Sequence, residues 1–207
     1  MKKTTLKEFK KKTNIELLTE LLNNNNGYLT SSLVTELGIH RMYIKIMNER
    51  KMIKKLENGI YIGKNVKEDK YYTLSLSIPN VIFSHLTALY LQGFSNKKEI
   101  KKFDVTVVNT LINERLKKYN TFYVKKDFYS IGVIDYKTKE GNIIKIYDIE
   151  RCICDIIKNR KDLDLEEVKY SVRKYLKSSK CNLKKVYDYA EKLGIKEKVK
   201  DFIDIVR

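Results

Sequence analysis

The segment spanning residues 29–63 constrains the fold of this chain more than any other. It reads LTSSLVTELGIHRMYIKIMNERKMIKKLENGIYIG, in which Gly38 separates two short amphipathic runs and an Asn58-Gly59 pair separates two short apolar runs. Apolar residues that recur every three or four positions predict helices. Glycine often ends a helix in the left-handed conformation, and Asn-Gly is a strong hairpin signal. We therefore predict helices over 30–37 and 40–51, then a hairpin with strands at 53–56 and 60–62.

A further helix is predicted before this segment. Thr13 can cap its N-terminus while Glu16 reaches back, as in a capping box, and the leucines that follow lead to the run NNNNG. Three helices followed by a small hairpin are typical of a winged helix-turn-helix. We predict a DNA-binding domain of this kind over residues 1–63.

The third of these helices is predicted to have an apolar face and a basic face. Ile44 and Met47 are three apart and share one face, whereas Arg41, Lys45 and Asn48 follow the spacing of the opposite face. Arginine and asparagine have the shape for paired hydrogen bonds to guanine and adenine edges, and lysine suits a phosphate. The basic face is thus predicted to enter the major groove of DNA.

Other predicted contacts lie at a helix N-terminus, where free N–H groups suit phosphate, and on the hairpin. Together the candidate DNA-binding residues are Thr30, Ser31, Ser32, His40, Arg41, Tyr43, Lys45, Asn48, Lys54, Lys55 and Asn58. Over residues 40–56 there are six lysines and arginines against one acid, Glu49. A run of charge on a short helix is often only a solvated surface, and winged helices also dock proteins; a protein-docking module therefore stays an alternative.

Residues 64–207 are predicted to form a second domain with mixed secondary structure. We predict a strand over 71–78, a helix over 81–94, and strands within 103–108, 121–125 and 130–148, the last stretch turning at 139–142. From residue 149 the apolar spacing is helical to the end, with Asp148 and Asp164 as caps. The predicted class is α+β, with a helical C-terminal half.

The composition favours a nucleic-acid partner. Among 207 residues there are 43 lysines and arginines against 26 acids, which gives a formal net charge of +17, and residues 64–207 hold 31 of these basic side chains against 20 acids. Such a surface attracts polyanions. No apolar run is long enough to span a bilayer, and the basic start of the sequence is not followed by the apolar stretch of a secretory signal. We expect a cytoplasmic protein, and thiols rather than disulfides at its three cysteines.

The search for catalytic chemistry gives little. Ser84 and His85 are neighbours, and on a helix neighbours diverge by about 100°, so we do not expect them to act as nucleophile and base. Asp148, Glu150 and Asp155 could be imagined as a magnesium-dependent nuclease site, which stays an alternative, but a helix cap and a solvated helix face account for them. No phosphate-binding loop motif is present. We expect no catalytic site, no metal and no cofactor.

Several stretches resemble the AbiEi family, the antitoxins of bacterial type IV toxin-antitoxin and abortive-infection systems. In order along the chain they read GYLT leading into ELGIHR, then IFSHLTALYLQGF, then KTKEGNIIKIYDIERCICDIIKNR. The resemblance covers about residues 15–200. The sequence departs from the family at Leu86, where glutamate is often found, and at Cys152, where threonine is common.

This resemblance implies a protein of two parts. The N-terminal winged helix would bind inverted repeats in the promoter of its own operon and repress transcription. The C-terminal domain, residues 64–207, would counter a nucleotidyltransferase-like toxin without forming a stable complex with it. The family gives no reason to expect an enzyme here.

Overall fold

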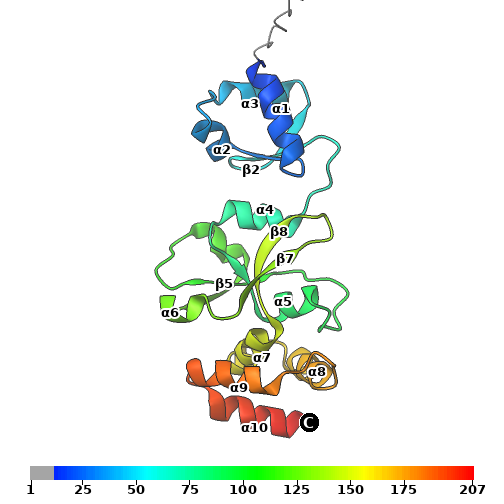
Figure 1. Ribbon diagram of the computed structural model, residues 1–207, viewed down its shortest axis with the longest axis vertical. Helices are drawn as coiled ribbons and strands as arrows, with labels where there is room; N and C mark the ends of the chain where they lie inside the picture. Colours follow the sequence, from blue (N-terminus) through cyan, green and yellow to red (C-terminus); the bar gives the residue numbers. More distant parts are fainter. Residues whose placement is uncertain (1–11) are drawn as a thin grey trace, which may run out of the picture. The chain divides into compact units, whose positions relative to one another are not determined.

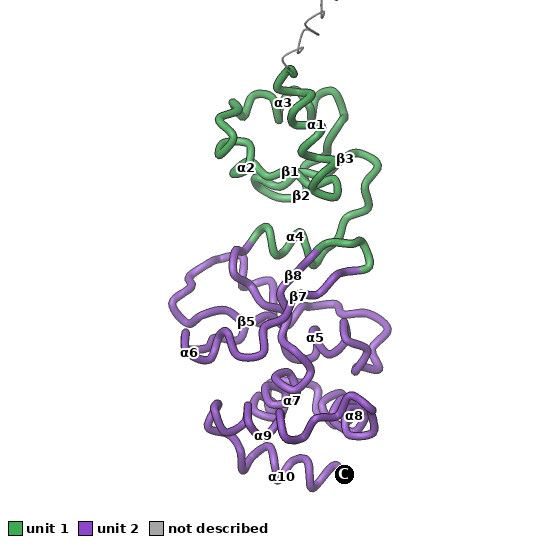
Figure 2. The backbone as a smooth tube through the Cα atoms, viewed as in Figure 1, with its two compact units in different colours: residues 1–77, 139–142 green, residues 78–138, 143–207 purple. Residues whose placement is uncertain are grey.

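The chain forms two compact units in a computed structural model that describes residues 12–207. Residues 1–11, which hold most of the basic start considered above, lie outside the described part. The first unit extends to Ser77 and includes the short segment Lys139–Asn142, and the second comprises Ile78–Thr138 and Ile143–Arg207 (Figure 2). The predicted division at Gly63 separates a DNA-binding part from an antitoxin part, and it stays a prediction.

Helices and a small sheet alternate along the first unit. Its elements are α1 (Asn14–Asn24), β1 (Tyr28–Thr30), α2 (Ser31–Glu36), α3 (Met42–Glu49), β2 (Ile53–Glu57), β3 (Ile60–Gly63) and α4 (Lys70–Ser77) (Figure 1). The strands form an antiparallel sheet in the order β1-β3-β2. The helices and the hairpin predicted over 13–63 are confirmed, whereas β1 was not predicted.

Local sequence explains where the first helices begin and end. The N–H of Thr13 donates to Oε2 of Glu16 at 2.7 Å, and the N–H of Glu16 donates to Oγ1 of Thr13 at 3.3 Å, which confirms the capping box. Oγ1 of Thr30 accepts from the N–H of Leu33 at the start of α2. Gly38 has a φ of +70°, the left-handed conformation predicted for it, and this turn separates α2 from α3.

The small sheet is covered on both faces. Side chains of a strand alternate between faces, and here both sets are apolar. Leu29, Ile53 and Tyr61 pack with the apolar residues of α1, α2 and α3. On the opposite face Tyr28, Ile60 and Ile62 pack with Val66, Tyr72 and Leu76, the last two from α4. The helix α4 therefore completes the core of the first unit.

The prediction of a strand over 71–78 was wrong, because these residues form α4. The alternation of leucine and serine in LSLS, residues 74–77, is the period-2 pattern of a strand and suggested one here. The deciding residue is Asp69, whose Oδ1 accepts from the N–H groups of Tyr71 and Tyr72 at 3.0 and 3.2 Å and so starts a helix. The ring of Tyr72 then meets that of Tyr28 edge to face, with centroids 4.9 Å apart.

Asp69 also explains why a distant segment belongs to the first unit. Its Oδ2 accepts from Nδ2 of Asn142 at 2.9 Å, and Lys67 pairs with Glu140 at 2.7 Å. These contacts attach the turn at 139–142, which was predicted between two strands, to the residues around the start of α4.

The second unit contains a mixed sheet and a helical C-terminal part. Its elements are β4 (Ile82–Phe83), α5 (His85–Leu91), β5 (Asp104–Val108), the 3-10 helix η1 (Glu114–Lys118), β6 (Asn120–Val124), α6 (Lys126–Tyr129), β7 (Val133–Lys137), β8 (Ile143–Tyr147), α7 (Ile149–Lys158), the 3-10 helix η2 (Arg160–Asp162), α8 (Leu165–Leu176), α9 (Leu183–Lys192) and α10 (Lys196–Val206). The strand order is β6-β5-β4-β8-β7, with β4 parallel to β8 and antiparallel to β5. The structure thus confirms the α+β class.

The helix predicted over 81–94 is only partly present. Ile82 and Phe83 form β4, the central strand of the sheet, in which Phe83 lies opposite both Val105 and Ile146. The helix α5 begins two residues later, at His85. A strand of two residues is too short to show a periodicity in the sequence. The helical spacing of the residues after it was therefore taken to begin at residue 81.

The helices predicted from residue 149 onward are confirmed, and α7 lies at their centre. Every residue of α7 from Glu150 to Ile157 is buried, and α7 contacts α8, α9 and α10 (Figure 1). Asp148 caps α7 and Asp164 caps α8, as predicted. Over residues 12–207 none of the helices is long and apolar enough to span a bilayer.

Candidate nucleic-acid interface

The helix α3 has the two faces that its sequence predicts. Ile44 and Met47 are buried in the core formed with α1 and α2, and Ile39 packs against the same cluster. Arg41, at the start of the helix, is exposed, as are Lys45 and Asn48. The apolar side chains fix the rotation of α3 about its axis, and this rotation turns the basic and amide groups outward.

Two of these outward groups have a neighbour within the first unit. Nε of Arg41 donates to Oγ1 of Thr35 at 3.0 Å, a contact that orients the guanidinium from α2. Nζ of Lys45 lies 3.8 Å from a carboxylate oxygen of Glu49, and both side chains are largely exposed. An exposed pair of this kind contributes little to stability, so neither contact prevents binding to an outside partner.

His40 and Tyr43, the other predicted contacts near α3, differ from each other in role. Nδ1 of His40 accepts from the N–H of Met42 at 3.2 Å, so this exposed histidine caps the helix, a function that Arg41 does not supply. Tyr43 is half-buried and packs against the core of the first unit. His40 is thus held at the tip of α3, whereas Tyr43 is mainly a packing residue.

The hairpin places its two lysines on opposite faces of the sheet. Lys54 lies opposite Ile62 and Lys55 opposite Tyr61, and the register shifts between Lys55 and Glu57. By the alternation of strands, Lys55 shares the face that α1, α2 and α3 cover, whereas Lys54 shares the face that α4 covers. Both side chains are exposed because β2 is an edge strand.

The start of α2 lies next to the hairpin turn. The N–H of Ser31 donates to the carbonyl of Gly59 at 2.8 Å, and Oγ of Ser32 lies 3.0 Å from Oγ1 of Thr30. Gly59 has a φ of +81° and Asn58 beside it is exposed. The structure therefore brings Thr30, Ser31, Ser32 and Asn58 to one corner, although they are far apart in sequence.

The charge of this region stays available to a ligand. All six lysines and arginines of residues 40–56 are exposed, and among the described residues only Lys45 of the six forms an ion pair. These residues follow one another from α3 into β2, and Glu49 is the one acid among residues 40–56. A surface of this composition suits the phosphates of a nucleic acid.

The acidic residues of the alternative nuclease site are engaged with basic partners. Nζ of Lys185 lies 3.0 Å from both Asp148 and Glu150, and Asp155 pairs with Arg151. The prediction that Asp148 caps a helix is confirmed, but Glu150 and Asp155 are buried and do not form the solvated face that we expected. Within residues 12–207 no group of three or more metal-ligating side chains comes together.

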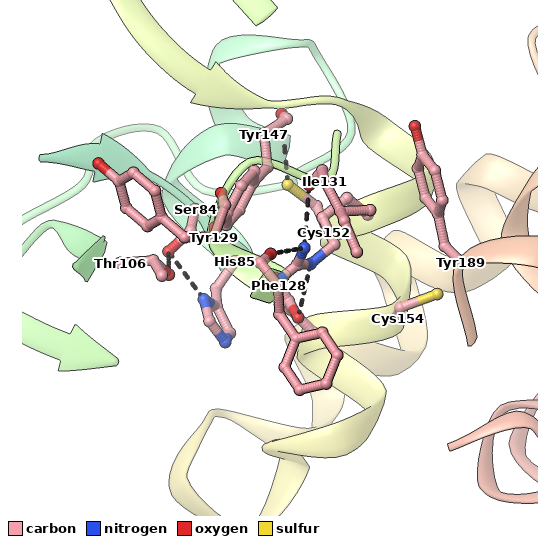
Figure 3. A network of polar contacts seen from close by, with 12 residues as sticks. Ser84, His85, Thr106, Phe128, Tyr129, Ile131, Tyr147, Cys152, Cys154 and Tyr189 are labelled. Atoms are coloured by element: carbon pink, nitrogen blue, oxygen red, sulfur yellow. Dashed lines mark hydrogen bonds and ion pairs between the residues drawn. The ribbon is translucent and has the colours of Figure 1, made fainter. Parts of the chain in front are cut away.

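Ser84 and His85 do approach each other, contrary to the expectation from helical spacing. Ser84 is extended and His85 has a φ of +47°, so Oγ of Ser84 lies 2.8 Å from Nδ1 of His85 (Figure 3). Nε2 of His85 lies 2.8 Å from Nδ2 of Asn159, and the imidazole stacks on Phe122. The expected divergence of about 100° holds for neighbours inside a helix, whereas Ser84 precedes α5 and is extended.

Burial decides what this serine and histidine can do. Both are almost inaccessible, and burial, with the charges of Arg151 and Lys158, lowers the pKa of His85 to about 3. The imidazole is therefore neutral near pH 7, and in this conformation a substrate has no access to the hydroxyl. The contacts connect β4, α5 and the end of α7, and so are structural.

Arg151 is the largest buried polar side chain of the second unit, and the sequence reading missed its role. Its Nε lies 3.0 Å from Oδ2 of Asp155, and its Nη1 donates to the carbonyls of Phe128 and Ile131 at 2.7 and 2.9 Å (Figure 3). The guanidinium carbon lies 4.3 Å from the ring centroid of Tyr147. The sequence did carry a signal for this role, because Arg151 and Asp155 are four residues apart in a helix whose other side chains are largely apolar.

Comparisons with known proteins place the fold alone. No family model matches this sequence, and no curated protein matches it. The chain is similar to the crystal structure of the RV2827C protein from Mycobacterium tuberculosis, with a TM-score of 0.62 over 92% of this chain and 75% of that chain. The identity is 10%. The likeness shows a shared α+β fold.

Proposed function

We propose that the first unit is a winged helix-turn-helix, in which α2 and α3 form the helix-turn-helix and β2 and β3 the wing. The observation that carries this proposal is the outward face of α3, with Arg41, Lys45 and Asn48 exposed and Ile44 and Met47 buried. A helix that is anchored on one face and basic on the other can enter a major groove.

The proposed roles follow the chemistry of each side chain. Arg41 and Asn48 read base edges in the groove, and Lys45 binds a phosphate. Of the two hairpin lysines, Lys55 lies on the face of the sheet that α1, α2 and α3 cover and contacts a phosphate beside the groove, whereas Lys54 lies on the α4 face and is given no contact. Ser32 and Asn58 are exposed at the corner formed by α2 and the hairpin turn, and suit the neighbouring backbone of the same strand of DNA.

Within this proposal the chain is an antitoxin that represses its own promoter by binding inverted repeats there. The antitoxin activity belongs to residues 64–207 and opposes a nucleotidyltransferase-like toxin, without a stable complex and without an enzymatic reaction. The resemblance to the AbiEi family in the segments quoted above supports this assignment. The protein would act in the cytoplasm, where both the promoter and the toxin are present.

A second candidate is a winged helix that docks a protein instead of DNA. Leu37 and Met42, on the two sides of the Gly38 turn, are 50% and 51% exposed. Large apolar side chains at the surface are typical of protein interfaces when they gather. The basic residues that follow in α3 and β2 favour DNA over this candidate.

The binding test uses full-length protein and labelled duplex DNA from upstream of its gene, with and without Mg²⁺. A salt-sensitive shift that leaves the DNA intact supports the proposed repressor. Cleavage in Mg²⁺ supports a nuclease, and the absence of a shift supports protein docking.

The antitoxin assignment needs a separate test in cells. Expression of a neighbouring nucleotidyltransferase-like gene should arrest growth, and co-expression of this chain should restore it. Arg41→Ala should lose repression yet keep rescue, because the two activities are assigned to different parts of the chain. Growth arrest that persists with the wild-type chain would refute the assignment.

A further inference from the structure

A cavity in the second unit is lined by basic residues that DNA binding by the first unit does not use. Its volume is about 850 Å³, and one side is formed by the C-terminal half of α8 and the residues that follow. Tyr170, Arg173, Lys174, Lys177 and Lys180 line this side, and residues 92–94 and Asn96, after α5, line the other. Ligand pockets have volumes of about 300–1,000 Å³, so the cavity has the size for a small molecule or a nucleotide.

The charge in the cavity is positive and largely uncompensated. Glu166 is the one acid that lines it, and Lys169, which does not line it, pairs with Glu166 at 2.7 Å. Over the part of the chain that the structure describes, the ammonium groups of Lys174, Lys177 and Lys180 form no ion pair. Like charges gathered around a cavity repel one another and favour an anion between them.

One basic side chain is held in place by the fold. Nε of Arg173 donates to the carbonyl of Val206, near the end of α10, at 3.2 Å. This bond uses one of the five N–H groups of the guanidinium and leaves a planar donor set that can pair with a phosphate. A held arginine loses less side-chain freedom on binding than a lysine does.

The cavity also offers an aromatic face and polar groups that suit a base. Tyr170 is partly exposed on the lining, with Nζ of Lys174 5.6 Å from its ring centroid. On the other side, Nε2 of Gln92 donates to the carbonyls of Ala88 and Tyr147, which fixes the orientation of its amide. Gly93 has a φ of +83°, and a Cβ added there would meet nothing within 4 Å, so this wall is open.

We propose that this cavity binds a nucleoside phosphate, with the phosphate among Arg173, Lys174 and Lys177 and the base against Tyr170. Unpaired bases stack on aromatic side chains, whereas the bases of a duplex are inaccessible to a cavity. The ligand is either a free mononucleotide or one nucleotide of a single strand. This site is separate from α3, and the inference does not rest on the proposed repressor function.

The test measures binding of a fluorescent mononucleotide and of a short labelled single-stranded RNA to full-length protein. We expect Lys174→Gln with Lys177→Gln to weaken binding about tenfold or more, and to lower the salt slope by about 1.4 if both lysines contact a strand. Tyr170→Ala should weaken it about fivefold or more through lost stacking. If these substitutions weaken binding of the mononucleotide, the ligand is a free nucleotide. If they weaken binding of the RNA alone, the ligand is one nucleotide of a single strand.

The matched control is Lys198→Gln with Lys200→Gln, two exposed lysines of α10 outside the cavity that give the same change in net charge. It should leave the affinity within about twofold. Equal weakening by both pairs of substitutions, or no binding of either probe to wild type, overturns the inference. So does inorganic phosphate that competes as well as the nucleotide. Arg41→Ala should leave this binding intact; its loss there would assign the ligand to the first unit.

Discussion

Arginine is used in opposite ways in the two units. Arg41 of the first unit lies exposed at the start of α3, with one contact to Thr35. The side chain of Arg151 in the second unit is 1% exposed and is surrounded by Asp155, two backbone carbonyls and the ring of Tyr147. The guanidinium of Arg41 is free to bind a ligand, whereas that of Arg151 is engaged by partners inside the second unit. The net charge of +17 counts both alike, so burial must be known before charge is assigned to binding.

The largest effect expected from this comparison is the loss of the buried arginine. Arg151→Met leaves Asp155 without its partner and the carbonyls of Phe128 and Ile131 without their donor. Breaking a buried ion pair by removing one member costs about 3–5 kcal/mol. We expect the free energy of unfolding, measured by urea denaturation and circular dichroism, to fall by about this amount.

Two control variants sharpen this result. Arg50→Met removes an exposed arginine and should change the free energy of unfolding by about 0.5 kcal/mol or less. Adding Asp155→Leu to Arg151→Met should restore part of the loss, because it removes the uncompensated carboxylate. Equal effects of Arg151→Met and Arg50→Met would show that the buried pair does not stabilise the second unit.

A smaller effect per pH unit is expected from the neutral His85 close to this pair. Since the pKa of His85 is lowered to about 3 in the folded chain, the unfolded chain binds more protons between about pH 6.5 and pH 3. The free energy of unfolding should therefore fall as pH falls through this range, by at most about 1.4 kcal/mol per pH unit for this group.

His85→Asn is the variant that isolates the contribution of the imidazole. Asparagine tolerates the positive φ of this position and keeps a polar amide beside Ser84. Its stability at neutral pH is expected to be lower, but its pH profile should be flatter than that of wild type below about pH 6.5. Parallel profiles would mean that His85 is not the group that titrates.

The sequence predicted most helices of both units because their signals are local. Thr13 with Glu16, Gly38, Asp148 and Asp164 end or begin helices through contacts within a few residues, and the structure has each of them. It failed at α4, where the alternation in LSLS outweighed the local cap at Asp69, and at β4, where distant contacts decide. The strand β4 is short and is defined by its neighbours β5 and β8.

The candidate site shows the same limit. The exposed face of α3 follows from spacing alone, since Ile44 and Met47 mark the opposite side. The meeting of Ser31 with Gly59, and that of His85 with Asn159, needs the fold, because no periodicity relates these positions. The burial of Arg151 was also hidden, because an arginine in a helix is usually at the surface.

For Arg41, the exposed arginine, the expected effect is on the affinity for the operator, the inverted repeats in the promoter. If Arg41 reads a base edge, Arg41→Ala should cost about 1–3 kcal/mol of operator affinity and relax specificity at one position. Lys45→Ala should weaken binding uniformly and lower the salt slope by about 0.9. Gel shifts over a range of salt and operator sequences measure both. Thr35→Ala, which keeps the guanidinium but removes its internal partner, serves as the control and should have the smaller effect.

The smallest expected effect separates the two lysines of the hairpin. Lys55 lies on the face of the sheet that α1, α2 and α3 cover, and Lys54 lies on the face that α4 covers. A duplex that contacts α3 is therefore on the side of Lys55. We expect Lys55→Ala to lower the salt slope of operator binding by about 0.9, the value for one phosphate contact, and Lys54→Ala to leave the slope unchanged. Both variants remove one charge from adjacent exposed positions, so each is the control for the other. A slope lowered by Lys54→Ala and not by Lys55→Ala would place the DNA on the α4 side of the sheet and exclude α3 as the reading helix.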